Sequence, residues 1–185
     1  DAEVCDDGNE NEGDGCDNAS AVETGWTCDG NEPTACVVIH GDGLLRGDEV
    51  CDDQNLVDGD GCAVTSTQEQ GWSCDGLEPT SCLVIHSDGL LRGAEACDDG
   101  NEDAGDGCDN ASAVEHGYYC NGEPSICETR CGDGITVVAT EECDDENQAD
   151  TDGCTETCRI ELGYACDIVA EPSTCTTVCG DGIVV

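Results

Sequence analysis

Acidic side chains recur in a fixed pattern along this chain, and they are candidate ligands for a metal ion. Four times, Glu stands two residues before a Cys, two Asp follow that Cys, Asn comes two residues later, and an Asp-Gly-Cys phrase closes the stretch. Another Asp recurs in Gly-Asp-Gly or Ser-Asp-Gly phrases. Ca²⁺ takes six to eight such hard oxygen ligands, and a divalent cation relieves the repulsion among carboxylates. The pattern therefore predicts structural calcium sites.

The predicted ligands fall into four sets. They are Glu3, Asp6, Asp7, Asn9 and Asp14, with Asp181 supplied by a preceding copy; Asp42, Glu49, Asp52, Asp53, Asn55 and Asp60; Asp88, Glu95, Asp98, Asp99, Asn101 and Asp106; and Asp133, Glu141, Asp144, Asp145, Asn147 and Asp152. The EF-hand pattern fits poorly, because its glycine and its closing Glu are misplaced. The alternative is a solvated acidic surface with Asx-turns and no metal.

No catalytic constellation accompanies these acids. The three histidines, His40, His86 and His116, are spread over the chain. There is no nucleophile motif such as G-x-S-x-G and no phosphate-binding loop. Paired carboxylates are so frequent that none is distinguished from the others. We therefore expect a protein that is not an enzyme.

Composition points to an extracellular or cell-surface protein held by disulfides. The chain has 45 acidic residues against four arginines, no Phe, no Met and 19 cysteines, with a formal charge of −41. A large apolar core cannot be built from this inventory, whereas this density of cysteine is typical of disulfide scaffolds in oxidising compartments. The charge excludes nucleic acid and anionic membrane surfaces as direct partners. No stretch approaches the apolar length of a membrane span.

The cysteines define an internal repeat. Cys5, Cys51, Cys97 and Cys143 are each 46 residues apart. The predicted divisions are 1–39, 40–85, 86–130, 131–178 and, as the opening of a further repeat, 179–185. Abundant Gly, Asp and Asn predict turns, and the runs "CVVIH", "CLVIH" and "GITVV", from Cys36, Cys82 and Gly134, predict brief strands. "ASAVE", at 19–23 and 111–115, could open a short helix. The expected fold is an elongated array of small disulfide-rich tandem repeats, with irregular loops, short β-strands or hairpins and little helix.

The consensus C-G-D-G…E-x-C-D-D-G-N…D-G-C-x3-C-x2-E-x-G-[WY]-x-C…E-P-[ST]-x-C resembles the Myxococcus-type cysteine-rich disulfide repeat. "CDDGN" followed by "GDGC" carries the resemblance best, at Cys5–Cys16 and Cys97–Cys108. The resemblance covers nearly the whole chain. It implies an extracellular location and tandem arrays, and no catalytic activity. The six cysteines of that family are complete only in the fourth repeat, which adds Cys131 and Cys158.

Spacing leaves the disulfide connectivity open. Short closures such as Cys5–Cys16 and Cys28–Cys36 are favoured among three possible pairings per repeat. The two further family positions are His40 and Ser66 in the second repeat, and His86 and Ser112 in the third. Their paired loss suggests a Cys131–Cys158 bond, although Cys158–Cys179 explains most of the pattern too. The expected disulfide-bonded set is Cys5, Cys16, Cys28, Cys36, Cys51, Cys62, Cys74, Cys82, Cys97, Cys108, Cys120, Cys127, Cys131, Cys143, Cys154, Cys158, Cys166 and Cys175, which leaves Cys179 unpaired or intermolecular.

The ends of the sequence read as two halves of one repeat. The tail "CGDGIVV", Cys179–Val185, placed before the head "DAEVCDDGN", Asp1–Asn9, restores the repeat in register. This predicts head-to-tail assembly of copies into an extracellular filament, or else one period of a longer chain. An adhesion or binding module of a larger surface protein is the alternative. Asn18 and Asn110 open N-glycosylation sequons, so attached glycans are also expected.

Overall fold

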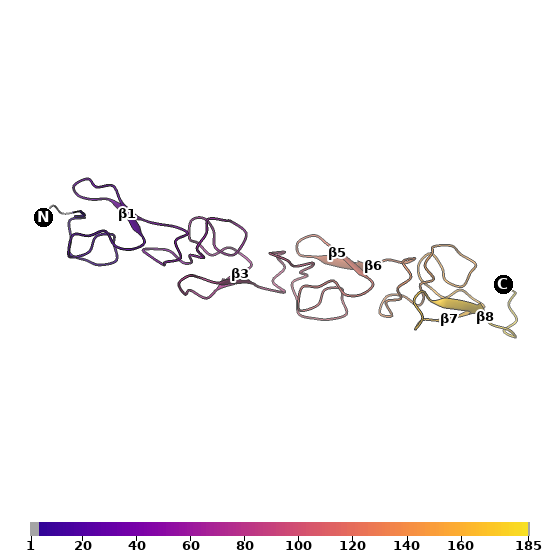
Figure 1. The fold of residues 1–185 in the computed structure, drawn as a ribbon. Helices are drawn as coiled ribbons and strands as arrows, with labels where there is room; N and C mark the ends of the chain where they lie inside the picture. The colour runs from indigo at the N-terminus through magenta and orange to yellow at the C-terminus, as the bar shows by residue number, and fades with distance from the viewer. Residues whose placement is uncertain (1–3, 185) are drawn as a thin grey trace. The chain divides into compact units, whose positions relative to one another are not determined.

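The computed structural model describes residues 4–184, and the chain divides into two compact units, Asp1–Ile85 and His86–Val185. The division falls between the second and third predicted repeats. Regular structure in the described residues consists of eight strands of three or four residues, and no helix is present there (Figure 1). The predicted class, small disulfide-rich repeats built of loops and hairpins, is confirmed.

In the first unit, each repeat contributes one antiparallel hairpin. Strand β1 (Trp26–Cys28) pairs with β2 (Cys36–Val38), and β3 (Trp72–Cys74) pairs with β4 (Cys82–Val84). In each hairpin the two cysteines lie directly opposite one another and are joined by a disulfide. Because isolated hairpins are marginal in water, this covalent link fixes both the pairing and its register.

The second unit repeats this arrangement with slightly longer strands. Strand β5 (Tyr118–Asn121) pairs with β6 (Ile126–Thr129), and β7 (Tyr164–Asp167) pairs with β8 (Thr174–Thr177). Cys120 lies opposite Cys127, and Cys166 lies opposite Cys175. The four hairpins are therefore copies of one element, held by one cross-strand disulfide each.

The core of each repeat is made of sulfur rather than of hydrocarbon. Among the described residues, the buried apolar side chains are cysteines and Trp72. In the first repeat the four sulfurs of Cys5, Cys16, Cys28 and Cys36 all lie within 4.8 Å of one another, so two disulfides stack. A Cβ at Gly15 would overlap the side chain of Cys36, which explains the glycine in the Asp-Gly-Cys phrase.

Nine disulfides form; eight are short local closures, and Cys131–Cys158 joins residues that are 27 apart. They are Cys5–Cys16, Cys28–Cys36, Cys51–Cys62, Cys74–Cys82, Cys97–Cys108, Cys120–Cys127, Cys131–Cys158, Cys143–Cys154 and Cys166–Cys175. Each closed loop of this length contributes about 3 kcal/mol by restricting the unfolded chain. Cys131 bonds Cys158, not the competing partner Cys179, and Cys179 is an exposed free thiol.

Two local predictions are wrong. "ASAVE" opens no helix at 19–23 or at 111–115, because Val22 and Val114 form isolated β-bridges to Cys16 and Cys108. "GITVV" at 134–138 forms no strand, because Gly134 closes a turn in which Asp133 accepts the N–H of Ile135. "CVVIH" and "CLVIH" do form strands, β2 and β4.

Candidate functional site

A buried aspartate organises the loop that enters the second repeat. Asp52 is 1% exposed, and its carboxylate accepts four backbone N–H groups. Oδ2 takes those of Gly41 and Asp42 at 2.7 and 3.2 Å, and Oδ1 takes those of Gly43 and Gln54 at 2.8 and 3.0 Å. Four charge-assisted donors balance the cost of burying the charge. We name this arrangement the aspartate socket. It consists of a buried aspartate carboxylate and the loop that surrounds it, which is 41–43 here and the equivalent loop in other repeats.

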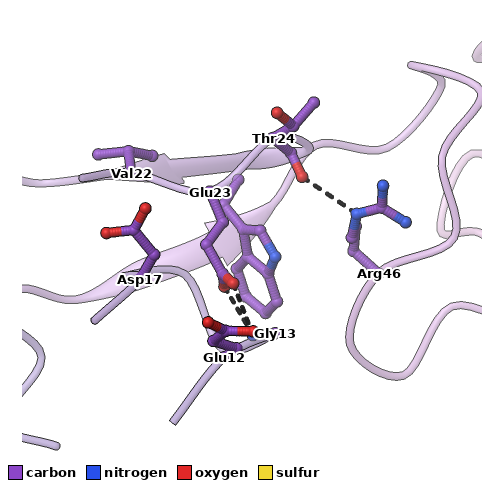
Figure 2. A pocket seen from close by; sticks show the side chains of 8 residues that line it. Glu12, Gly13, Asp17, Val22, Glu23, Thr24 and Arg46 are labelled. Atoms are coloured by element: carbon purple, nitrogen blue, oxygen red, sulfur yellow. Dashed lines mark hydrogen bonds between the residues drawn. The ribbon is translucent and has the colours of Figure 1, made fainter. Parts of the chain in front are cut away.

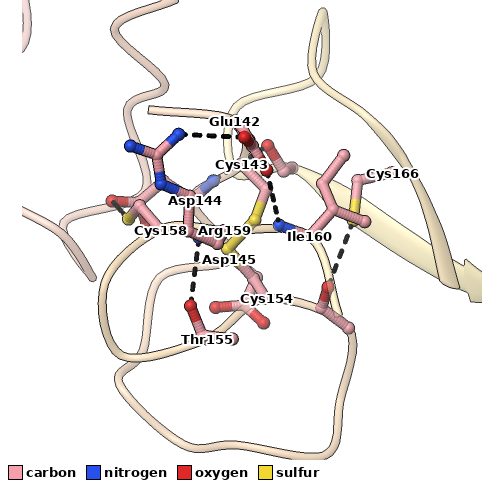
Figure 3. Close-up of a disulfide and its surroundings, with 12 residues drawn as sticks. Glu142, Cys143, Asp144, Asp145, Cys154, Thr155, Cys158, Arg159, Ile160 and Cys166 are labelled. Atoms are coloured by element: carbon pink, nitrogen blue, oxygen red, sulfur yellow. Dashed lines mark hydrogen bonds and ion pairs between the residues drawn. A yellow bond between two sulfur atoms is a disulfide. The ribbon is translucent and has the colours of Figure 1, made fainter. Parts of the chain in front are cut away.

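The second unit contains two more aspartate sockets. Asp144 is 0% exposed and accepts N–H groups from Gly132, Asp133, Gly134 and Glu146, beside the Cys143–Cys154 disulfide (Figure 3). Asp98 is 1% exposed and accepts those of Asp88, Gly89 and Gly100. In all three sockets, a loop about ten residues earlier in the chain closes over the aspartate.

In the first repeat, the residue equivalent to the socket aspartates is Asp6. Asp6 is exposed, and among residues 4–184 its carboxylate accepts the N–H of Gly8 alone, at 2.9 Å. Its backbone nevertheless makes the same hydrogen bonds as that of a socket aspartate. The Asp6 N–H donates to Thr34 Oγ1, and the Thr34 N–H donates to the Asp6 carbonyl. Asp52 and Thr80 make the same two bonds.

The segment 180–182 has the sequence and backbone shape of a socket loop. Gly180 and Gly182 have φ of 94° and 85°, close to the 90° and 84° of Gly132 and Gly134 in a filled socket. The Ile183 N–H donates to Asp181 Oδ1 at 2.9 Å, as the Leu44 N–H does to Asp42. Within the described part of the chain, no acceptor takes the N–H groups of 180–182. The backbone of this segment is therefore similar to that of a filled socket loop.

A triangle of His, Glu and Ser occupies the place of a disulfide in two repeats, at the positions that correspond to Cys131 and Cys158. His40 Nδ1 lies 2.8 Å from Glu49 Oε1 and 2.7 Å from Ser66 Oγ, and the Ser66 hydroxyl donates to Glu49 at 2.8 Å. His86, Glu95 and Ser112 repeat this triangle. One imidazole nitrogen contacts both partners, so the ring does not relay a proton between them as in a catalytic triad. The triangle replaces a covalent link with hydrogen bonds.

The predicted calcium ligands separate into two groups. The first group lies outside residues 53–60 and their equivalents, and its carboxylates accept backbone N–H groups: the socket aspartates; Glu49, Glu95 and Glu141; and Asp42, Asp88 and Asp133. The second group lies in the acidic loop, defined here as residues 53–60 and its equivalents. There Asn55 Nδ2 donates to Asp60 Oδ2 at 3.1 Å, as Asn9 does to Asp14 and Asn101 to Asp106. Glu3 lies outside the described residues.

Burial, and then repulsion between neighbouring carboxylates, mark the acidic loop as the better candidate for a cation. Burial, and then the charge of Asp60, raise the pKa of Asp53. Burial and the charge of Asp152 raise the pKa of Asp145 in the same way. Asp60 Oδ1, Asp14 Oδ1 and Asp145 Oδ1 are buried atoms that accept no hydrogen bond from residues 4–184. In the second repeat, Asp53, Asn55 and Asp60 therefore lie close together, and Asp60 has a buried oxygen atom that could bind a cation.

The sequence analysis missed one set of structural carboxylates. Glu23 accepts the N–H groups of Gly13 and Gly15, and Glu69 accepts those of Gly59 and Gly61. Glu115 in the third repeat and Glu161 in the fourth accept two backbone N–H groups in the same way. These residues are the Glu of the consensus E-x-G-[WY], so their regular spacing was an available signal. They hold the acidic loop closed.

Arg46 joins the first two repeats. Its Nε donates to the Thr24 carbonyl at 3.0 Å, and its Nη1 donates to Glu78 Oε1 at 2.7 Å. Arg46 also lines a pocket with Glu23 and Trp26, which Figure 2 shows from close by. The donors from Leu45 and Arg46 lower the pKa of Glu78. One side chain therefore bridges the end of one repeat and the hairpin of the next.

The two predicted glycosylation sites are both exposed to solvent, but the hydroxyl residues of their sequons have different surroundings. Asn18 and Asn110 are both exposed. Ser112, the hydroxyl residue of the second sequon, is 4% exposed because it belongs to the His86 triangle. Ser20, its counterpart in the first sequon, has no such partner among the described residues. Glycan attachment stays a prediction.

These features define a cysteine-rich tandem-repeat protein. The family described as Domain of unknown function (DUF4215) matches residues 23–68 and again residues 115–159, and the two matches begin two 46-residue periods apart. No curated protein and no solved structure matches the chain. The chain is therefore similar to this family in two of its stretches. The resemblance to the Myxococcus-type repeat stays an expectation.

Proposed function

We propose that this protein is a structural tandem-repeat unit of an extracellular filament, assembled head-to-tail. The observation that carries the proposal is the repetition of one disulfide-held unit, in which the sockets of Asp52, Asp98 and Asp144 recur every 46 residues. Head-to-tail contacts that do not close into a ring generate open fibres. The proposal assigns the protein no catalytic role.

Disulfides support the extracellular part of the proposal. Bonds of this kind persist in oxidising compartments and are rare in the cytosol, and nine of them hold this chain. Separately, no helix in residues 4–184 has the length and apolar character to cross a membrane. Glycans on Asn18 and Asn110 would suit the same location.

Assembly is tested with purified residues 1–185 at physiological salt, because the net charge of −41 opposes association at low ionic strength. We expect the weight-average mass in sedimentation equilibrium to rise with protein concentration, and electron micrographs at the highest concentration to show fibres with a regular axial period. A mass of 19.1 kDa at every concentration would contradict the proposal.

A binding or adhesion module of a larger protein is the second candidate. The pocket that Trp26 lines with Glu23, Asp17 and Arg46 favours it, because an aromatic ring beside several polar groups suits a small polar ligand. A strictly monomeric chain would support this candidate over the filament. Binding that is lost in Trp26→Ala but retained in Trp72→Ala would support it directly.

We also propose that the acidic loops bind Ca²⁺ as a structural ion. In the second repeat the ion would be held by Asp53, Asn55 and Asp60, and it would relieve the repulsion between the carboxylates of Asp53 and Asp60. Extracellular modules bind calcium with dissociation constants of about 10⁻⁴–10⁻³ M. Asp52 and Glu49 would then act as supports of the loop rather than as ligands.

Calcium is expected to stabilise the protein, and Asp60→Asn to remove much of the effect. At about 10 mM Ca²⁺ the linkage gain is about 1–3 kcal/mol, seen as a rise of several degrees in Tm. Without calcium, the raised pKa of Asp53 means that its contribution to stability is present below the ordinary value of 3.8 and is lost as pH rises. Asp60→Asn should therefore raise the calcium-free Tm at pH 7.

The matched control is Asp48→Asn, which removes one exposed charge outside the acidic loop and should keep the calcium response. Thermal unfolding followed by circular dichroism, with EDTA and with Mg²⁺ in parallel, makes the measurement. If EDTA leaves Tm unchanged in the wild-type chain, the acidic loops are solvated surface and the calcium proposal is wrong.

A further inference from the structure

We propose that the cavity where the first two repeats meet binds an organic ammonium group, through the ring of Trp26 and three carboxylates. The carboxylates are those of Glu12, Asp17 and Glu23. This inference rests on the second candidate function, the binding module, and names the chemical class of its ligand. The cavity measures about 440 Å³, which suits a small ligand or one long side chain, and its lining lies within residues 12–46. We name it the Trp26 pocket.

Two carboxylates of the Trp26 pocket have an oxygen available to a ligand. Asp17 Oδ1 accepts the N–H groups of Ala19 and Ala21 at 2.9 Å each, whereas Asp17 Oδ2 accepts none from residues 4–184. Glu12 Oε1 accepts the Asn18 side-chain amide at 3.3 Å, and no donor of the described chain reaches Glu12 Oε2. An ammonium group, which carries only donors, matches such a pair of acceptors.

Arg46 brings a cation to the lining, but its charge is already paired. Its Nη1 lies 2.7 Å from Glu78 Oε1, and its Nε donates to the Thr24 carbonyl at 3.0 Å. Figure 2 shows Arg46 and Asp17 on opposite sides of Glu23. The carboxylate side of the pocket therefore keeps its negative potential. Within a chain of net charge −41, this potential favours a cationic ligand and disfavours an anionic one.

The ring of Trp26 is held in place by both repeats. A Cβ on Gly15 would lie 3.5 Å from its Cε3 atom, and a Cβ on Gly47 would lie 3.4 Å from its Cη2 atom. Trp26 Nε1 is a buried atom without an acceptor in residues 4–184, so the ring rather than its N–H is available to a ligand. Tryptophan is the aromatic residue that attracts a cation most strongly, within about 6 Å of the ring centroid. A fixed indole beside carboxylates therefore suits an ammonium group.

Sequence differences among the repeats confine this combination to the first one. The residues equivalent to Glu12, Asp17, Glu23 and Trp26 are Asp58, Ala63, Glu69 and Trp72 in the second repeat; Ala104, Asp109, Glu115 and Tyr118 in the third; and Asp150, Thr155, Glu161 and Tyr164 in the fourth. The glutamate recurs because it holds the acidic loop closed. Tryptophan and the aspartate at the position of Asp17 occur together in the first repeat alone, so the other repeats supply matched controls.

The test is a nuclear magnetic resonance titration of ¹⁵N-labelled residues 1–185 with n-butylammonium. The protein is prepared without N-glycans, because Asn18 contacts Glu12, and the buffer contains calcium so that the acidic loops do not compete for the ligand. The chain has two indole N–H signals, from Trp26 and Trp72. We expect a saturable shift of the Trp26 signal while the Trp72 signal stays in place. n-Butanol, the uncharged counterpart, should require about tenfold higher concentration for the same shift.

Substitutions that remove one charge at a time make the result specific. Asp17→Asn keeps the Oδ1 acceptor and its two backbone hydrogen bonds, so it should fold, and we expect it to raise the dissociation constant about two- to fivefold. Asp109→Asn is the matched control, because Asp109 Oδ1 accepts the N–H groups of Ala111 and Ala113 in the same way. It should leave the dissociation constant unchanged. Trp26→Tyr, which introduces the residue type of the third and fourth repeats, should also weaken binding.

Several outcomes would overturn the inference. Equal shifts of the two indole signals, or equal effects of Asp17→Asn and Asp109→Asn, would show that the acidic chain attracts cations without a site. A Trp26 shift that n-butanol produces as readily as n-butylammonium would overturn the ammonium selectivity and leave the binding-module candidate standing. The titration reports on single sites and does not depend on fibre formation, so its failure is distinct from failure of the filament.

Two further ligands separate the possible sources of the ammonium group. Spermidine represents a free polyamine, and Nα-acetyl-lysine methylamide represents a lysine side chain of a partner protein. Tighter binding of spermidine would support the pocket as a site for free amines. Binding of the lysine derivative that is as tight or tighter would support it as a site for a partner's lysine. Failure of both, together with n-butylammonium, to shift the Trp26 signal would contradict the proposal.

Discussion

Asp52→Asn is expected to lower the free energy of unfolding by at least about 3 kcal/mol and to disrupt the aspartate socket of the second repeat. The Asp52 carboxylate is 1% exposed and accepts two N–H groups on each oxygen. An asparagine amide, whichever way it is turned, presents an NH₂ group to one of these pairs. Two buried or part-buried hydrogen bonds then lose their acceptor, at about 1–3 kcal/mol each.

The matched control is Asp6→Asn, at the equivalent position of the first repeat. Asp6 is exposed and accepts a single N–H group, so the free energy of unfolding of the monomer should change by less than about 0.5 kcal/mol. Urea denaturation at dilute concentration, with amide exchange of Gly41, Asp42 and Gly43, makes the measurement. Equal losses in both variants would show that burial of the carboxylate is not the source of its contribution.

Reduction of the disulfides is expected to unfold the whole chain in buffer without denaturant. Each loop closed by a disulfide contributes about 3 kcal/mol, and the sum over nine of them exceeds the total stability of an ordinary domain. No hydrocarbon core would remain, because the buried apolar residues of the described chain are cysteines and Trp72. The charge of −41 would expand the reduced chain further.

Small-angle scattering and tryptophan fluorescence check this result. The reduced and alkylated chain should reach a radius of gyration of about 45 Å or more, the size of an unfolded chain of this length, and Trp72 should become solvent-exposed. Alkylation of Cys179 without reductant is the control and should leave both signals unchanged, because this thiol is exposed and unpaired. Native fluorescence retained after full reduction would contradict the sulfur-based core.

Part of this architecture could be predicted because cysteine spacing is a local property. A disulfide that joins residues 7–11 apart needs only a short turn between them, and the Gly and Asp residues of the intervening loops supply it. The strands β2 and β4 also follow from local composition. The predicted strand "GITVV" at 134–138 does not form because carboxylates accept its backbone N–H groups. Strand propensity takes no account of such side-chain acceptors.

The role of each acid could not be predicted in the same way. Asp52 and Asp53 are adjacent and chemically identical in the sequence, yet one is buried among N–H donors and the other lies beside Asp60. A carboxylate can be satisfied by backbone donors or by a cation, and the choice depends on which residues reach it in three dimensions. The sequence therefore predicted the acidic clusters as metal sites without separating supports from candidate ligands.

By itself, the amino-acid sequence determined the repeat, its 46-residue period and the disulfide scaffold, since all of these depend on residue type and spacing. Tertiary structure decided that Cys131 bonds Cys158, and that Asp52, Asp98 and Asp144 are buried among backbone N–H donors. The physical reason is that hydrogen bonds to a buried carboxylate depend on direction and distance, which linear spacing does not encode.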